Sequence, residues 1–219
     1  MKNLHNALQL KQLHILKQLG YRYTGITPSE LKEESIELPH DIEKLKALVL
    51  DCHLCELSKS RQRVVFGEGN LKADLLFVGE GPGATEDSTG RPFVGRIGEV
   101  LTKMIENVLH VPRSEVYIAN IVKCRPPDNR VPTESEAHTC RPFLQKQISL
   151  IQPKIIVTLG ATAYHYLTND NSPMSNVRGT VIQGDGYKII PTFHPSYLLR
   201  NPSVKKEALG DLLKVKALL

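Results

Sequence analysis

Three loops that follow short apolar runs carry the side chains best suited to chemistry. The first loop contains Glu80 and Glu86 among glycines and is followed by Phe93, the second begins at Asn120, and the third begins at His194. A carboxylate can activate water, an imidazole can donate to developing negative charge, and an amide can read the polar edge of a ring. Taken singly, each also has an ordinary explanation: solvated acids in a tight turn, a hydrogen-bonded asparagine, and a turn punctuated by proline.

The glycine-rich loop excludes two familiar nucleotide-binding patterns. Gly79 to Gly83 is not the G-x-G-x-x-G pattern of dinucleotide-binding proteins, because Pro82 and Ala84 break its spacing, and no P-loop lysine follows. Glycines without side chains still let backbone N–H groups approach a ligand closely. The loop therefore indicates a ligand site of another kind.

The four cysteines are too few for a disulfide framework, and their spacing suggests a metal centre. Cys52 and Cys55 form a C-x2-C pair, whereas Cys124 and Cys140 are more widely separated. Four thiolates suit either Zn²⁺ or a [4Fe–4S] cluster, and the spacing does not decide between them.

Short apolar runs alternate with helical patterns, which predicts an α/β fold with a parallel sheet covered on both faces. Because loops at the carboxyl ends of parallel strands lie at one edge, the three loops should converge. Expected strands are residues 74–79, 115–122 and 154–159, followed by a hairpin of 177–183 and 187–192; expected helices are residues 41–50, 95–108, 133–150, 161–167 and 203–219.

The chain begins with a segment of a different character. Leucines at intervals of three and four predict an amphipathic helix over residues 1–19, ended by Gly20, and residues 21–40 have weak periodicity. We therefore expect a helical extension and connection over residues 1–40 and a main domain over residues 41–219.

The composition is that of a folded chain with a mild basic excess. Of the 219 residues, 41% are hydrophobic and 23% charged, and the formal net charge is +5. This charge is compatible with nucleic acid as a partner without requiring it. No apolar run approaches the ~18 residues of a membrane-spanning helix, and no secretory signal is present, so we expect a cytoplasmic protein with no membrane partner.

Together the three loops make a specific pattern. The chain resembles the family 4 uracil-DNA glycosylases, the iron–sulfur branch of the uracil-DNA glycosylase superfamily, from about Leu48 to Leu219. The motifs that carry the resemblance are Gly79-Glu80-Gly81-Pro82-Gly83 with Glu86-Asp87 and Gly90-Arg91-Pro92-Phe93, Asn120 with Lys123-Cys124-Arg125-Pro126-Pro127, and His194-Pro195-Ser196 through Arg200-Asn201-Pro202. The resemblance implies a three-layer α/β/α fold with a central, mainly parallel four-stranded sheet. It also implies a repair enzyme that flips uracil out of DNA and hydrolyses its N-glycosidic bond, leaving an abasic site for base excision repair.

The family pattern implies roles for the loop residues. Phe93 would stack on the flipped base, Asn120 would distinguish uracil from cytosine, and His194 would donate to uracil O2. Backbone groups around Glu80 and Gly81 would border the sugar and base, and Glu80 is the candidate for activating water. A separate hypothesis places Glu86 near uracil C5, where it would exclude thymine.

The resemblance further implies a structural [4Fe–4S] cluster held by the four cysteines. For contact with single- or double-stranded DNA, we expect Leu198 and Leu199 to wedge into the base stack and Arg200 to bind phosphate. Nothing in this mechanism requires more than a monomer.

Two alternatives stay open. One is a sister branch that remains covalently attached to its product through a histidine, although the Lys-Arg-Arg-Ile-His run of that branch is absent between Cys124 and Cys140. The other is a non-catalytic nucleic-acid-binding module.

Overall fold

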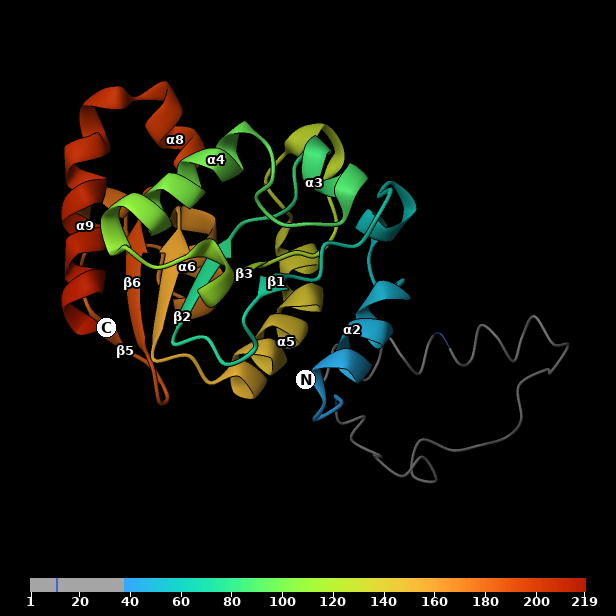
Figure 1. Ribbon diagram of the computed structural model, residues 1–219. Coiled ribbons are helices and arrows are strands. Elements are labelled where there is room, and N and C mark those ends of the chain that lie inside the picture. Colours follow the sequence, from blue (N-terminus) through green and yellow to red (C-terminus); the bar gives the residue numbers. More distant parts are fainter. Residues whose placement is uncertain (1–10, 12–37) are drawn as a thin grey trace, which may run out of the picture.

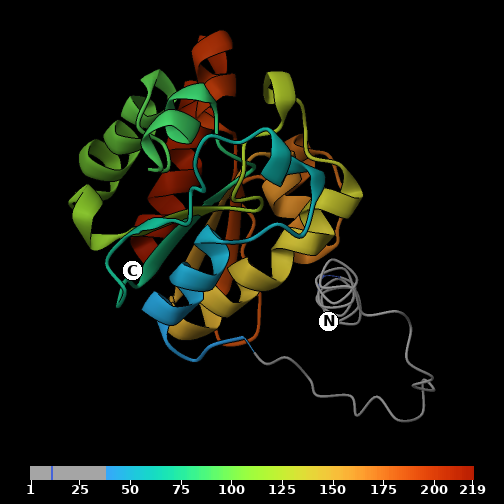
Figure 2. The same ribbon diagram turned by 90° about the vertical axis from the view of Figure 1, so that its right-hand side faces the viewer.

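A computed structural model describes residue 11 and residues 38–219 of the chain. The helix expected over residues 1–19 and most of the connection expected over 21–40 lie outside the described residues. The described part is a six-stranded sheet between two layers of helices (Figures 1 and 2). None of its helices is long and apolar enough to cross a membrane.

The sheet has the order β1-β3-β2-β4-β6-β5. Its strands are β1 (Glu68–Gly69), β2 (Leu75–Gly79), β3 (Tyr117–Asn120), β4 (Ile155–Leu159), β5 (Ile182–Gln183) and β6 (Lys188–Thr192). The four inner strands are parallel, which confirms the expected core of the sheet, and every residue of β2, β3 and β4 is buried, as in sheets covered on both faces. The predicted hairpin is confirmed by β5 and β6, which pair antiparallel, although its first arm forms a strand only over Ile182–Gln183. The expectation omitted β1, a two-residue strand that pairs antiparallel with β3 at the other edge.

Helices cover both faces of the sheet, which confirms the three-layer architecture. On one face α2, α5 and α6 pack against β2, β3 and β4, and on the other α4, α8 and α9 pack against the same strands (Figure 1). The helices are α2 (Ile42–Leu50), α3 (Ala84–Thr89), α4 (Arg96–Lys103), α5 (Glu134–Ile151), α6 (Ala161–Thr168), α7 (Met174–Val177), α8 (Pro195–Arg200) and α9 (Lys205–Leu218). The chain after α4 continues as a π-helical turn over Met104–Leu109, so the helix expected over residues 95–108 is present in two forms.

Local signals in the sequence explain where two helices begin. The Asp41 carboxylate accepts a hydrogen bond of 2.9 Å from the Lys44 N–H, which makes it the N-cap of α2. Thr133 and Glu136 form a reciprocal capping box at the start of α5. These caps fix the entry points of the two helices that carry or flank the cysteines.

The strand order creates a crevice at one end of the sheet. From β2 the chain passes to β3 on one side, whereas β4 on the other side of β2 leads to β6. The connections that leave β2 and β4 therefore diverge, and ligands of open α/β sheets bind at such a point, outside the carboxyl ends of the strands. The loops that follow Gly79, Asn120 and Thr192 all begin at this end of the sheet.

Candidate active site

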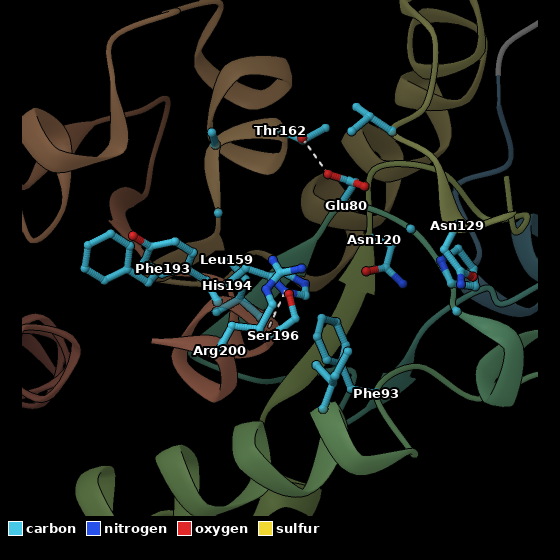
Figure 3. A pocket seen from close by; sticks show the side chains of 18 of the residues that line it. Glu80, Phe93, Asn120, Asn129, Leu159, Thr162, Phe193, His194, Ser196 and Arg200 are labelled. Carbon is cyan, nitrogen blue, oxygen red and sulfur yellow. Dashed lines mark hydrogen bonds between the residues drawn. The ribbon is translucent and has the colours of Figure 1, made fainter. Parts of the chain in front are cut away.

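The three predicted loops converge, as expected, around one cleft of about 1140 Å³ at the carboxyl ends of the strands. Glu80, Asn120, Phe93 and His194 all line this cleft, and Figure 3 shows them arranged around a common space. Gly81 lines it as well, and a Cβ at this position would lie 2.7 Å from a methyl carbon of Val122. The cleft is therefore built from segments far apart in the sequence.

Phe93 is held in an unusual backbone conformation. Its φ angle is +50°, in the left-handed region that non-glycine residues rarely adopt. The neighbouring glycines make room for it, because a Cβ on Gly79 would lie 2.6 Å from the phenyl ring and one on Gly98 would lie 1.9 Å from the Phe93 carbonyl oxygen. The ring centroid lies 5.9 Å from that of His194. Strain of this kind is found at ligand sites, where the surrounding structure over-determines it.

Glu86 holds the loop that carries Phe93. One carboxylate oxygen accepts a hydrogen bond from the Gly83 N–H at 3.1 Å, and the other accepts from the N–H groups of Val94 and Gly95 at 3.1 and 3.3 Å. Glu86 also lines the cleft. Its carboxylate therefore connects the glycine-rich loop to the segment that follows Phe93.

Asn120 offers an unpaired hydrogen-bond acceptor. It ends β3, is 1% exposed, and its side-chain Oδ1 has no hydrogen-bond partner within the described part of the chain. A Cβ at Gly79 would lie 2.4 Å from this oxygen, so any larger residue at position 79 would clash with the Asn120 amide. Leaving a buried acceptor without a donor costs about 1–3 kcal/mol. A ligand N–H that enters the cleft would remove this cost.

His194 is arranged as a neutral donor. The backbone N–H of Ser196 donates to its Nδ1 at 3.2 Å, and the Ser196 hydroxyl oxygen lies 2.7 Å from the same atom. Because Nδ1 accepts from a backbone N–H, the proton of the neutral ring is on Nε2. Burial, together with the nearby Arg200 cation, lowers the His194 pKa to about 4. At neutral pH the ring is therefore an uncharged donor.

Glu80 is positioned by the helix that follows β4. The Thr162 hydroxyl donates a hydrogen bond of 2.6 Å to Glu80 Oε2 (Figure 3). The main-chain oxygen of Glu80 accepts from the Val122 N–H at 3.1 Å, which joins the glycine-rich loop to the segment after β3. Both the carboxylate and the backbone of Glu80 are thus held at the crevice.

The expectation that Leu198 wedges into DNA is wrong for this structure. Leu198 is 3% exposed and belongs to the core cluster formed with α4 and α9, so it is not available to a base stack. The exposed aromatic of α8 is Tyr197, which is 39% exposed and whose ring stacks on that of Phe193 at 5.1 Å. Arg200 is exposed and lines the cleft, as its predicted role requires, whereas Leu199 is half-buried.

The four cysteines line one small pocket between α2, the segment after β3, and α5. Burial raises the pKa of all four thiols, to about 11 for Cys124 and about 12 for Cys140. No group of three or more His, Cys, Asp or Glu side chains in the described part is already arranged to hold a metal ion. The donor set nevertheless fits a cluster by its chemistry, because four sulfurs share one pocket. Two of them accept hydrogen bonds, Cys124 Sγ from the Arg61 guanidinium at 3.4 Å and Cys140 Sγ from the Lys123 N–H at 3.3 Å.

Lys123 joins the cysteine pocket to the cleft. Its side chain is 1% exposed, and its ammonium group donates to the Asn120 carbonyl oxygen at 2.9 Å and to Gln147 Oε1 at 2.6 Å. Burial lowers the Lys123 pKa to about 8. Lys123 therefore holds the end of β3 with its side chain and contacts Cys140 with its backbone.

Thr162, Ser196 and Tyr197 line the cleft and were not predicted as site residues. Ser196 stood in the motif, and its two-residue separation from His194 was the available signal. Thr162 carried no signal, because its contact with Glu80 joins residues from the ends of two different strands.

Comparison with known proteins identifies the family. Residues 66–213 match the uracil DNA glycosylase superfamily, so the chain belongs to it. Over 180 residues it is 48% identical to a type-4 uracil-DNA glycosylase from Thermotoga maritima, which covers 80% of this chain and 93% of that protein. A type-4 enzyme from Sulfurisphaera tokodaii is 44% identical over 186 residues, covering 81% and 84% of the two chains. A type-5 uracil-DNA glycosylase from Pyrobaculum aerophilum is 28% identical over 163 residues, covering 67% and 72%.

Proposed function

We propose that this protein removes uracil from DNA by hydrolysing its N-glycosidic bond, and so starts base excision repair. Membership of the superfamily and the names of its relatives support the class of reaction. The observation that carries the proposal is the buried, unpaired Oδ1 of Asn120, which lines the same cleft as the Phe93 ring. The Phe93 ring and the unpaired hydrogen-bond acceptor of Asn120 together suit a planar base with a polar edge.

The Asn120 amide matches uracil better than cytosine. Its oxygen can accept from uracil N3–H, and its NH₂ group can donate to O4. Cytosine presents an unprotonated N3 and an amino group, so the same amide would face mismatched partners. Unpaired buried groups of this kind can be worth roughly 10⁴-fold in discrimination.

The chemistry follows from where charge develops. The target nucleotide must leave the stack to reach the cleft, where Phe93 would stack on the base. As the C1′–N1 bond breaks, its electron pair stays on uracil, and His194 Nε2–H would donate to O2 as negative charge develops there. Water then bonds to C1′, and one of its protons passes to the Glu80 carboxylate.

The proposal includes a [4Fe–4S] cluster held by Cys52, Cys55, Cys124 and Cys140. When bound, the cluster supplies four iron–sulfur bonds that connect distant segments of the chain, and glycosidic hydrolysis needs no electron from it. The shared pocket and the two hydrogen bonds to sulfur support this assignment. The four described cysteines are unpaired, which agrees with a reducing, cytoplasmic location. We propose that the protein acts as a monomer.

The decisive experiment is a single-turnover reaction on a labelled oligonucleotide with one uracil, followed by alkali. Scission should depend on uracil and fall about 10²–10³-fold in Asn120→Ala, because two hydrogen bonds of about 1–3 kcal/mol each are lost. Asn70→Ala is the matched control, since Asn70 is bonded to Glu115 on the surface and does not line the cleft.

Other outcomes distinguish the alternatives. Covalent capture would shift the protein on a denaturing gel, and simple binding would give neither scission nor a shift. No scission from protein that retains its iron–sulfur absorbance would overturn the proposal in favour of a binding module.

A further inference from the structure

One side chain holds the carboxylate of Glu80. The Thr162 hydroxyl donates to Oε2 at 2.6 Å, and no other side chain in the described part of the molecule is hydrogen-bonded to this carboxylate. Within the same part of the molecule Oε1 has no hydrogen-bond partner, and both residues line the cleft. The Glu80 side chain would otherwise be free to rotate about three single bonds, at an entropic cost when it is ordered.

The contact spans the point where the strand connections diverge. Glu80 directly follows β2, and Thr162 is the second residue of α6, which directly follows β4. These strands are parallel neighbours, with Val78 opposite Thr158. The start of α6 is itself fixed, because the Gly160 N–H donates to the Thr192 oxygen at 2.9 Å. The hydroxyl is thus presented by a rigid element.

We propose that Thr162 is a positioning residue for Glu80 in the proposed glycosylase reaction, on which this inference rests. By fixing Oε2, the hydroxyl keeps Oε1 available to the attacking water. After the C1′–N1 bond has broken, the water oxygen bonds to C1′, and the released proton passes to Oε1.

The test compares three threonine variants. Thr162→Val removes the hydroxyl at nearly constant shape, Thr162→Ser keeps it, and Thr168→Val is the matched control. Thr168 lies on the same helix and donates to the Tyr164 carbonyl oxygen at 2.8 Å, away from the cleft. The single-turnover rate and KM for uracil-containing DNA are measured for each variant.

We expect Thr162→Val to lower the rate roughly 10–100-fold, as loss of a hydrogen bond to a charged group implies, with little change in KM. Thr162→Ser should restore most of the rate, and Thr168→Val should behave as wild type.

A double variant separates positioning from packing. In a Glu80→Gln background, Thr162→Val should cause little further loss, since both changes act on one step. A full additional loss there, an unchanged rate in Thr162→Val, or an equal loss in Thr162→Ser would each overturn the proposal. Thermal unfolding verifies that the variants fold, and Thr162→Ala replaces valine if valine does not. If the wild type is active and Thr162→Val has the same rate, this inference alone is wrong. If the wild type does not excise uracil, the proposed function is wrong as well.

Discussion

Asn120 and His194 show two different ways of burying a polar group. The asparagine keeps an acceptor unpaired, whereas the histidine is neutral and has its tautomer fixed by the Ser196 N–H. Phe93 adds backbone strain in the same cleft. The unpaired acceptor and the strained backbone each cost folding free energy, of the order of 1–3 kcal/mol. All three features are compatible with a site organised before its ligand arrives.

His194 should make the free energy of unfolding depend on pH. Its pKa is about 4 in the folded protein, because burial disfavours the cation, and about 6.5 when the chain is unfolded. The unfolded state therefore takes up the proton first, and stability is lost as the pH falls from about 6.5 towards 4. Denaturant unfolding at pH 7.5 and pH 5 measures this loss, which should be smaller in His194→Asn. The exposed His110→Asn is the control, and equal losses in the His194 variant and wild type would contradict the prediction.

Glu86 should affect base binding through the Phe93 loop. Removing a carboxylate that accepts three backbone N–H groups frees the segment around Val94 and Gly95. We expect Glu86→Ala to raise KM for uracil-containing DNA by about tenfold, since hydrogen bonds to a charged group are lost, and the exposed Glu99→Ala to leave it unchanged.

The same variant tests the sequence-based hypothesis that Glu86 excludes thymine. Excision from a thymine strand by Glu86→Ala would support that hypothesis. Continued rejection of thymine with a raised KM would leave positioning of the loop as the function of this residue, and an unchanged KM would contradict the loop prediction.

At the scale of elements, apolar runs and helical periodicity predicted most of the fold. Asp41 and the Thr133–Glu136 pair fixed two helix starts, and continuous burial explains the inner strands. β1 is two residues long, too short to produce a period, so the sequence could not indicate it. The hairpin expected over residues 177–192 is present, but its first arm forms a strand only at Ile182–Gln183. Leu198 was misassigned because α8 is one short helix, and packing against α4 and α9 decides which of its leucines is buried.

Neighbouring residues of α8 should therefore have different effects. Tyr197 is exposed beside the cleft and its ring is already stacked on Phe193, so Tyr197→Ala should lower activity on duplex DNA more than on single strands. Leu198→Ala instead removes a core side chain and should cost about 2–5 kcal/mol of folding stability. Parallel activity assays and denaturant unfolding of both variants measure the contrast. Equal activity losses of Tyr197→Ala on both substrates would contradict the first expectation.

At the scale of the whole molecule, Lys123 connects the cysteine pocket, which it lines, to Asn120 in the cleft. Its backbone N–H contacts Cys140, and its ammonium group fixes the carbonyl of Asn120. The sequence predicted the two sites separately, from loops and from cysteine spacing. It could not predict the link, because Gln147, the other partner of this ammonium group, comes from α5 and meets Lys123 only in the folded chain.

The cysteines should act on the stability of the whole domain. A cluster that joins Cys52 to Cys140 closes a loop of roughly 90 residues. If it acts like a covalent crosslink, it lowers the entropy of the unfolded chain and so stabilises the fold by about 4–5 kcal/mol. For a domain of this size, each kcal/mol changes the melting temperature by about 2–4 °C. We expect Cys140→Ser to lose the visible iron–sulfur absorbance and to unfold about 10 °C lower or more. Thr139→Ser, which changes another residue lining the pocket, should do neither.

Because the proposed role of the cluster is structural, folded Cys140→Ser should still excise uracil well below its melting temperature. An unchanged melting temperature with full iron content would contradict the ligand assignment, and complete loss of activity in fully folded protein would contradict the structural role.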